Sequence, residues 1–264
     1  MSSIRFDIIT IFPKIFDSYF SESIIKRAVQ KKKIQIKIWN LRDFTKVKHH
    51  KVDDRPFGGG AGMVLQAEPI LRAVEKIKSG PKTKIILLSA KGRQFNQKMA
   101  YDWSKKYKNF VFISGRYEGI DERVKTVLKT CLPAGRAEEI SIGPYITTDG
   151  DVASMVIISA LTRLIPSVIN WSSLEDESFL RKLIREEAGS KSKELEYPHY
   201  TRPEVLKWPP PGRGKQGKNY SVPKVLLSGN HKKIEEWRKS HRRGFFSGLP
   251  KAKFPLSSKK RDRK

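Results

Sequence analysis

The chain is poor in cysteine, lacks a leader pattern and contains no long apolar run. Cys131 is the single cysteine among 264 residues, so no disulfide can form within the chain and no cluster has metal-ligand spacing. The first residues show no basic start, long apolar stretch and cleavage site of the kind that marks a signal peptide. No run approaches the roughly 18 apolar residues of a membrane span. These absences predict a protein of the reducing cytoplasm, without a metal centre or a membrane segment.

Acidic residues are also scarce relative to basic ones. The chain has 54 Lys and Arg against 27 Asp and Glu, a net charge of +27, while 38% hydrophobic residues are enough to build a core. Such an excess of positive charge favours a polyanionic partner. Nucleic acid is the first candidate and an anionic membrane surface is the second. A surface of solvated lysines without any partner is the remaining alternative.

Apolar runs alternate with helical patterns in the first part of the chain. Strand-like runs occupy 4–12, 34–40, 83–90 and 109–114, and a long helix is expected from about 150 to 165. This alternation predicts an α/β fold, with a mostly parallel sheet and helices on both faces.

The composition changes after the apolar stretch that ends near Val168. A charged segment with its own helical pattern follows, then a Pro/Gly-rich loop at 208–219 and a basic helix with an apolar face. We predict an α/β domain at 1–168, a flexible linker at 169–185 and a small, mainly helical basic domain at 186–264 that ends in a disordered tail.

A polar stretch, GRYEGIDERV, follows the apolar run at 109–114. In open α/β sheets, ligands bind at the carboxyl ends of the strands, so this position predicts a site. The alternative is an ordinary strand-to-helix turn, in which Gly115 and Gly119 supply backbone freedom and Asp121 caps a helix that begins at Glu122. A second glycine-rich stretch, DDRPFGGGAGMV at 53–64, matches neither the phosphate-loop nor the dinucleotide-binding pattern.

Several motifs in fixed order are more specific than any one of them. In chain order they are DDRPFGGGAGMV, GRYEGIDERV, SIG-Y, RLIP, YPHYTRPEV and VPKVLLSGNHKKIEEWR. From about Ile4 to Trp237, the chain resembles the bacterial tRNA (guanine-N1)-methyltransferases, which modify the guanine just 3′ of the anticodon, position 37 of the tRNA. The resemblance implies a deep trefoil knot of the SPOUT class, a homodimer with its site across the subunit interface, and S-adenosylmethionine as the cofactor.

The resemblance also implies which residues line the cofactor pocket. They are Leu87, Leu88, Ser89, Gly115, Tyr117, Glu118, Ser141, Ile142, Gly143, Tyr145, Ile146, Asp149 and Gly150. Two of the neighbouring residues depart from the family pattern, because Pro144 and Asp149 stand where the family usually has aspartate and glycine. The strength of cofactor binding is therefore left open, and Arg116 with the DER segment has the alternative role of holding the knot together by ion pairs.

Methylation at guanine N1 sets two chemical demands. The N1 proton must be removed by a base, and the charge that develops on O6 is stabilised by a cation. By resemblance the cation is Arg163 of RLIP, whose alternative role is that of a helix-end arginine. The base lies in LEDESF: the register favours Glu177 and the residue type favours Asp176, while a solvated acidic cluster is the alternative. Whether Mg²⁺ assists, as the family implies, is not determined by the sequence.

Contacts to tRNA are expected from the basic second domain and from the loop near residue 55. The candidates are Arg55, His199, Arg202, Asn230, His231 and Lys232. Two rival functions remain: an RNA-binding protein of the same fold with weak or lost catalysis, and a knotted methyltransferase that acts on another base.

Overall fold

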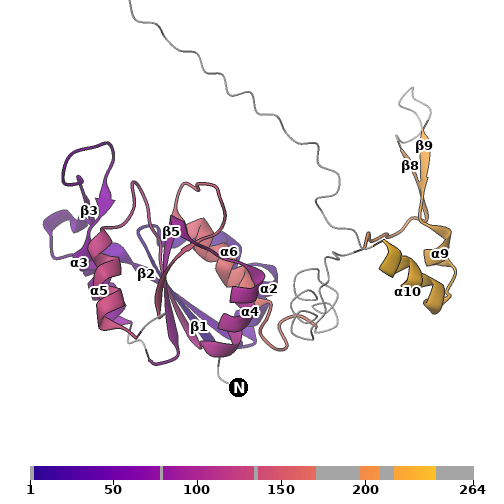
Figure 1. Ribbon diagram of the computed structural model, residues 1–264, viewed down its shortest axis with the longest axis horizontal. Helices are drawn as coiled ribbons and strands as arrows, with labels where there is room; N and C mark the ends of the chain where they lie inside the picture. The colour runs from indigo at the N-terminus through magenta and orange to yellow at the C-terminus, as the bar shows by residue number, and fades with distance from the viewer. Residues whose placement is uncertain (1–2, 78–79, 134–135, 171–196, 209–216, 242–264) are drawn as a thin grey trace, which may run out of the picture. The chain divides into compact units, whose positions relative to one another are not determined.

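The chain forms two compact units, Met1–Leu174 and Glu175–Lys264. The computed structural model describes residues 3–77, 80–133, 136–170, 197–208 and 217–241 (Figure 1). The division between the units falls inside the predicted linker, 169–185, most of which lies outside the described residues.

A five-stranded parallel sheet forms the centre of the first unit. Its strands lie in the order β2-β1-β6-β5-β7, and each pair of neighbours is parallel. Their bounds are β1 Ile4–Thr10, β2 Ile34–Asn40, β5 Thr83–Gln94, β6 Asn109–Ile113 and β7 Ala137–Ser141. The predicted parallel sheet is therefore confirmed. Two short strands, β3 Asp53–Asp54 and β4 Val64–Leu65, pair separately and antiparallel.

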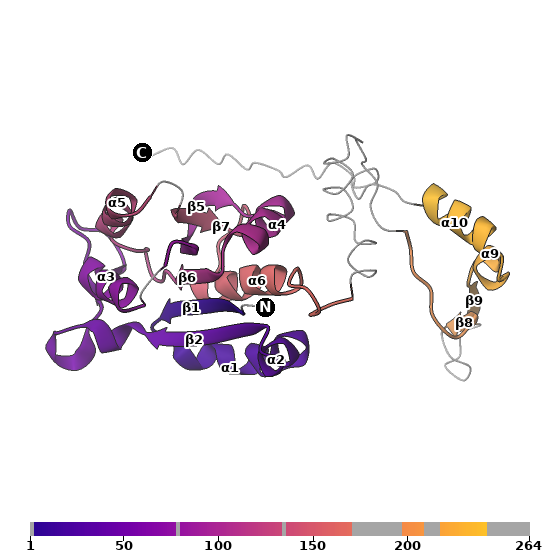
Figure 2. The ribbon, with the colours of Figure 1, turned by 90° about the horizontal axis from the view of Figure 1, so that it is seen from below.

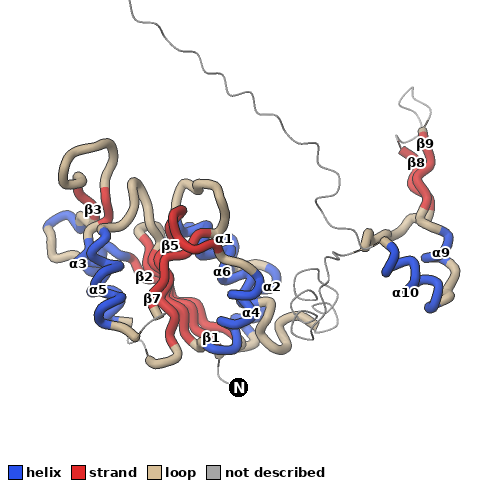
Figure 3. Tube along the Cα trace, viewed as in Figure 1, coloured by secondary structure: helices blue, strands red, loops and turns tan. Residues whose placement is uncertain are grey.

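Helices cover both faces of this sheet, as Figures 1 and 3 show. Their bounds are η1 Pro13–Phe16, α1 Asp17–Phe20, α2 Ser23–Gln30, η2 Leu41–Phe44, η3 Lys48–His50, α3 Ala67–Lys76, α4 Gln97–Lys106, α5 Glu122–Cys131 and α6 Gly150–Thr162. Side chains alternate along β6: Phe110 and Phe112 join the core under α2, α4 and α6, whereas Val111 and Ile113 join the core under α3 and α5. This alternation follows from the two-residue period of a strand.

Four elements differ from their expected lengths: β1 ends at Thr10 rather than at residue 12, β6 ends one residue early at Ile113, and β5 and α6 differ more. β5 continues to Gln94 instead of ending at residue 90, because its pairing with β7 shifts register between Leu88 and Arg93 and then resumes. α6 ends at Thr162 rather than at residue 165, so Arg163 is the C-cap of the helix and not part of its body. Arg163 therefore stands at the end of the helix, the position that the sequence left open as its alternative.

The second unit contains two strands and two helices among its described residues (Figure 2). β8 Val205–Trp208 pairs antiparallel with β9 Lys218–Ser221, and α9 Lys224–Leu227 precedes α10 His231–Ser240. The expected basic helix is confirmed as α10. The hairpin was missed, because each strand has only four residues and the Pro/Gly-rich sequence between them predicts a loop. No helix in the described ranges is long and apolar enough to cross a membrane.

Candidate active site

A pocket of about 370 Å³ opens at the carboxyl ends of β5, β6 and β7. Its walls come mainly from segments 87–91, 115–122 and 139–150, which follow or end these strands. The volume is in the range of small-molecule sites, and the position is the one that α/β sheets use for ligands. All residues that the resemblance assigned to the cofactor line this pocket, with the exception of Gly143.

Glycines allow the walls of the pocket to approach one another. The backbone N–H of Gly150 donates a hydrogen bond of 2.8 Å to the carbonyl of Gly115. A Cβ atom on Gly150 would lie only 2.8 Å from the Gly115 nitrogen, and one on Gly115 would lie 3.1 Å from the Leu88 carbonyl oxygen. Gly143 acts indirectly, because a Cβ atom there would overlap the ring of Tyr145, which does line the pocket.

Glu118 places a carboxylate in the pocket wall. Its backbone N–H donates to the carbonyl of Met63 at 3.0 Å, and a Cβ atom on Gly62 would overlap its side chain. The glycine-rich stretch at 53–64 therefore packs beside Glu118, although it matches no phosphate-loop pattern. Tyr117, the preceding residue, has a positive φ of 58°, a conformation that costs free energy for a side chain larger than glycine.

Asp149 serves the helix that closes the pocket. It is the N-cap of α6, and its Oδ1 accepts hydrogen bonds from the N–H groups of Asp151 and Val152 at 2.9 and 3.1 Å. The Arg116 guanidinium lies 3.6 Å from its other oxygen. Arg116 therefore balances the negative charge of Asp149, the residue that departs from the family pattern. Arg116 thus has the ion-pair role that the sequence left as an alternative.

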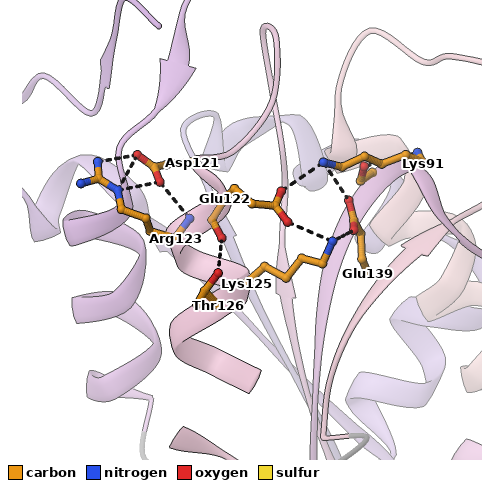
Figure 4. Close-up of polar contacts among 8 residues, drawn as sticks. Lys91, Asp121, Glu122, Arg123, Lys125, Thr126 and Glu139 are labelled. Carbon is orange, nitrogen blue, oxygen red and sulfur yellow. Dashed lines mark hydrogen bonds and ion pairs between the residues drawn. The ribbon is translucent and has the colours of Figure 1, made fainter. Parts of the chain in front are cut away.

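Four charged residues form a network along one wall of the pocket (Figure 4). Lys125 lies 2.7 Å from Glu139 and 3.0 Å from Glu122, while Lys91 lies 3.1 Å from Glu122 and 3.9 Å from Glu139. Burial favours the protonated form of Glu139, but hydrogen bonds from Lys125 and Ser89 and the nearby ammonium charges hold its pKa below the usual value. The hydrogen bond to Glu139 raises the pKa of Lys125. The shifts of Glu139 and Lys125 both favour the charged forms, and the network joins β5, α5 and β7.

The sequence alone did not predict that these four charged residues line a pocket. The available signal was the position of Lys91 and Glu139 at the ends of two apolar runs, but nothing in the spacing predicts that α5 returns to them. Glu122 forms ion pairs, the alternative role given above for the DER segment. Asp121 caps α5, because its side chain accepts a hydrogen bond of 2.9 Å from the N–H of Arg123. Within GRYEGIDERV, residues 115–122 all line the pocket, and Asp121 and Glu122 have a structural role as well.

Asp151 is a buried acid behind the pocket wall. Burial raises the pKa of its carboxyl and the charge of Asp149 acts in the same direction, against hydrogen bonds with Thr10 and Ser114 and the charge of Arg116. Nothing in the sequence distinguished this residue from other helix-start aspartates.

Arg163, one of the predicted catalytic residues, does not line the pocket of the same chain. Arg163 caps the carboxyl end of α6, whereas the pocket borders its amino end, and thirteen residues of helix span about 20 Å. Asp176 and Glu177 lie outside the described residues. Among the ranges that the structure does describe, no group of three His, Cys, Asp or Glu is placed to hold a metal ion.

The predicted RNA-binding residues are mostly exposed. Arg55 lies beside the glycine-rich stretch, Arg202 precedes the hairpin, and His231 and Lys232 begin α10. The ring of His199 contacts that of Tyr197 in a tilted arrangement, with the ring centres 4.6 Å apart. Asn230 differs from the others, because its side chain caps α10 by accepting from the N–H of Lys233 at 3.1 Å.

Comparison with known proteins identifies the family. A family model described as tRNA (Guanine-1)-methyltransferase TrmD matches residues 4–245. A Carboxydothermus hydrogenoformans protein named tRNA (guanine-N(1)-)-methyltransferase is 47% identical over 238 residues, which cover 89% of this chain and 81% of that protein. A Clostridioides difficile protein of the same name is 44% identical over 238 residues, covering 89% of this chain and 90% of its own. Because the match extends over nearly the whole chain at this level of identity, the chain belongs to the tRNA (guanine-N1)-methyltransferase family.

Proposed function

We propose that this tRNA (guanine-N1)-methyltransferase takes its methyl group from S-adenosylmethionine and modifies the guanine directly 3′ of the anticodon, position 37. The observation that carries the proposal is the pocket at the ends of β5, β6 and β7, where Gly115 and Gly150 meet through their backbones and Glu118 adds a carboxylate.

The lining of the pocket fits such a donor. Leu87, Leu88 and Ile142 offer apolar surface for an adenine ring, and the close backbone contact between Gly115 and Gly150 holds two walls of the pocket together. When bound, S-adenosylmethionine supplies an electrophilic methyl group on a cationic sulfur. The carboxylate of Glu118 lowers the electrostatic cost of holding that positive charge in a partly enclosed site.

At the acceptor, the chain supplies a base and a cation. Asp176 or Glu177 removes the N1 proton of guanine, and Arg163 stabilises the negative charge that spreads to O6. The separation between Arg163 and the pocket within one chain means that a single chain cannot provide both halves of this site.

A homodimer supplies the missing half. The exposed side of α6 carries Val152 and Val156, which are 41% and 44% exposed, and Ile146 beside the pocket is 87% exposed. Apolar residues at positions four apart on a helix form one stripe, which favours packing against a second copy. If two α6 helices pair antiparallel about a two-fold axis, Arg163 of the partner subunit comes to the pocket of the first.

The knot and the cytoplasmic location belong to the same proposal. Support for the knot comes from β5, which pairs with β7 in two stretches, and from Gly150, which bonds to Gly115 of a separate loop.

The rival reading as an inactive RNA-binding protein rested partly on Asp149, whose charge Arg116 balances. A requirement for Mg²⁺ is tested by repeating the assay with a chelator.

The test is methyl transfer from labelled S-adenosylmethionine to two tRNA transcripts, one with guanine and one with adenine at position 37. We expect N1-methylguanine at position 37 of the first and no label in the second. Label at another guanine of both transcripts would contradict the proposed position.

The composite site has its own test. Mixing an Arg163→Ala chain with a Glu118→Gln chain should restore part of the activity that each homodimer lacks, because one of the two sites in the mixed dimer receives both intact residues. Sedimentation as a monomer at assay concentration would contradict the dimer.

A further inference from the structure

The β8–β9 hairpin of the second unit is exposed along its whole described length. All residues of Val205–Trp208 and Lys218–Ser221 are exposed, including Trp208 at 58% and Tyr220 at 53%. In Figures 1 and 2 the hairpin extends away from α10 of the same unit. An isolated two-stranded hairpin is only marginally stable in water, so these apolar side chains gain most from a surface that covers them.

The pairing register sorts these side chains onto two faces. Leu206 lies opposite Tyr220, and Trp208 lies opposite Lys218. Directly opposite residues share a face, as do residues two apart on one strand. Leu206, Trp208, Lys218 and Tyr220 therefore form one side, which we call the aromatic face, and the Lys218 ammonium lies 5.8 Å from the centre of the Tyr220 ring. Val205, Lys207, Asn219 and Ser221 form the other.

The charge of the hairpin indicates the kind of molecule that covers it. Neither strand contains an acid, and the described residues of the second unit hold eight Lys or Arg against three Glu. A positive surface with exposed aromatic rings is typical of proteins that bind single-stranded nucleic acid, in which the rings stack on bases and the cations meet phosphates. An acidic protein would satisfy the lysines, whereas an unpaired nucleotide offers both a base for Trp208 or Tyr220 and a phosphate for Lys218.

We propose that the aromatic face binds an unpaired base of the tRNA substrate, which stacks on Trp208 or Tyr220 while Lys218 contacts a neighbouring phosphate. This inference rests on tRNA being the substrate. It adds a contact outside the donor pocket and outside the residues that the motifs predicted, and it assigns a role to the segment that the sequence analysis treated as a loop.

The test compares tRNA affinity for single variants of full-length protein. Loss of an aromatic that stacks on a base costs about 1–3 kcal/mol, so Trp208→Ala or Tyr220→Ala should weaken binding of a tRNA transcript by about 5- to 150-fold. The loss should be nearly the same at low and high salt, because stacking releases no counterions. Lys218→Ala should instead make the salt dependence shallower, by about 0.7 to 0.9 in the slope of log K against log salt.

Two matched controls separate stacking from folding. Val205→Ala changes the other face of the same strand and should leave affinity unchanged, and Trp208→Phe keeps a ring and should retain most of it. A further control is a fully paired RNA duplex with blunt ends, to which Trp208→Ala and wild type should bind equally. Circular dichroism confirms that each variant keeps the wild-type fold.

The outcomes distinguish this inference from the proposed function. If wild type methylates position 37 and the aromatic variants bind tRNA as tightly as wild type, the stacking contact is wrong while the function stands. The stacking contact would also be wrong if the aromatic variants lost as much affinity for duplex RNA as for tRNA, or if they differed from wild type only in sedimentation. If the variants lose tRNA affinity selectively but wild type modifies another guanine, only the proposed position fails.

Discussion

The two units of this chain differ in how much of each is buried. The first unit has two apolar cores, and residues such as Phe6, Phe112 and Ile85 are fully enclosed. Among the described residues of the second unit, none is buried, and its aromatic contacts, such as Trp237 on His241 at 4.1 Å, lie near the surface. The first unit is therefore stabilised by its own cores, while the apolar and basic groups of the described part of the second unit remain accessible.

The difference in burial between the units suggests that stability and catalysis depend on different parts of the chain. The pocket is built into the first unit, where its walls are held by backbone contacts and by the network of Lys91, Glu122, Lys125 and Glu139. The proposed base belongs by sequence to the other unit, which begins at Glu175. If the two units have these separate roles, some substitutions should change activity without changing stability, and others the reverse.

The largest effect is expected for the base. Loss of a general base costs about 10²- to 10⁴-fold, so either Asp176→Asn or Glu177→Gln should reduce single-turnover methylation by that order, and the other should not. Thermal unfolding and cofactor affinity of both variants should match wild type, since the first unit is unchanged. Full rates for both variants would place the base elsewhere.

Removal of a core aromatic should affect stability next most strongly. Phe112→Ala leaves a cavity between Phe6 and Phe110, and such changes cost about 3–5 kcal/mol. Leu227→Ala in the second unit alters a half-exposed side chain and should cost less than about 0.5 kcal/mol. Urea denaturation measures both, and comparable losses would contradict the contrast between the units.

A smaller effect is expected where the pocket walls touch. Gly150→Ala introduces a Cβ atom 2.8 Å from the Gly115 nitrogen, and overpacking of this kind costs about 1–3 kcal/mol. Calorimetry should show weaker binding of S-adenosylmethionine. The matched control is Gly80→Ala, since no atom lies within 4 Å of a Cβ atom at that position. Equal affinity for both variants would show that this contact does not shape the site.

The smallest effect concerns Asp151, whose pKa is raised by burial. Below the ordinary pKa of 3.8, the carboxyl is protonated in both folded and unfolded chains and costs nothing. As the pH rises above this value, the unfolded chain loses the proton first, so the folded state is progressively disfavoured. Asp151→Asn should therefore increase the free energy of unfolding at pH 7, by roughly 1 kcal/mol. The gain should disappear in denaturation measured below pH 4, and a gain independent of pH would contradict the buried charge.

Local elements were largely predictable because each depends on its own residues. The buried run at 109–114 became β6, the run at 34–40 became β2, and Asp121 caps α5 as its side chain and position suggested. The hairpin was not predictable, because β8 and β9 are stabilised by pairing with each other across a segment whose prolines and glycines signal a loop.

The sequence by itself determined four of the five strands of the parallel sheet, the long helix α6, the excess of positive charge and the family motifs, because hydrophobic periodicity, capping and composition are local properties. Only the tertiary structure decided that the ends of three strands converge on one pocket, that Asp149 has its charge balanced by Arg116, and that Arg163 stands a helix length from the donor side. Those facts depend on the order of strands in the sheet and on where α5 and α6 return to it. No local pattern encodes this, because contacts between distant segments are selected by packing of the whole core.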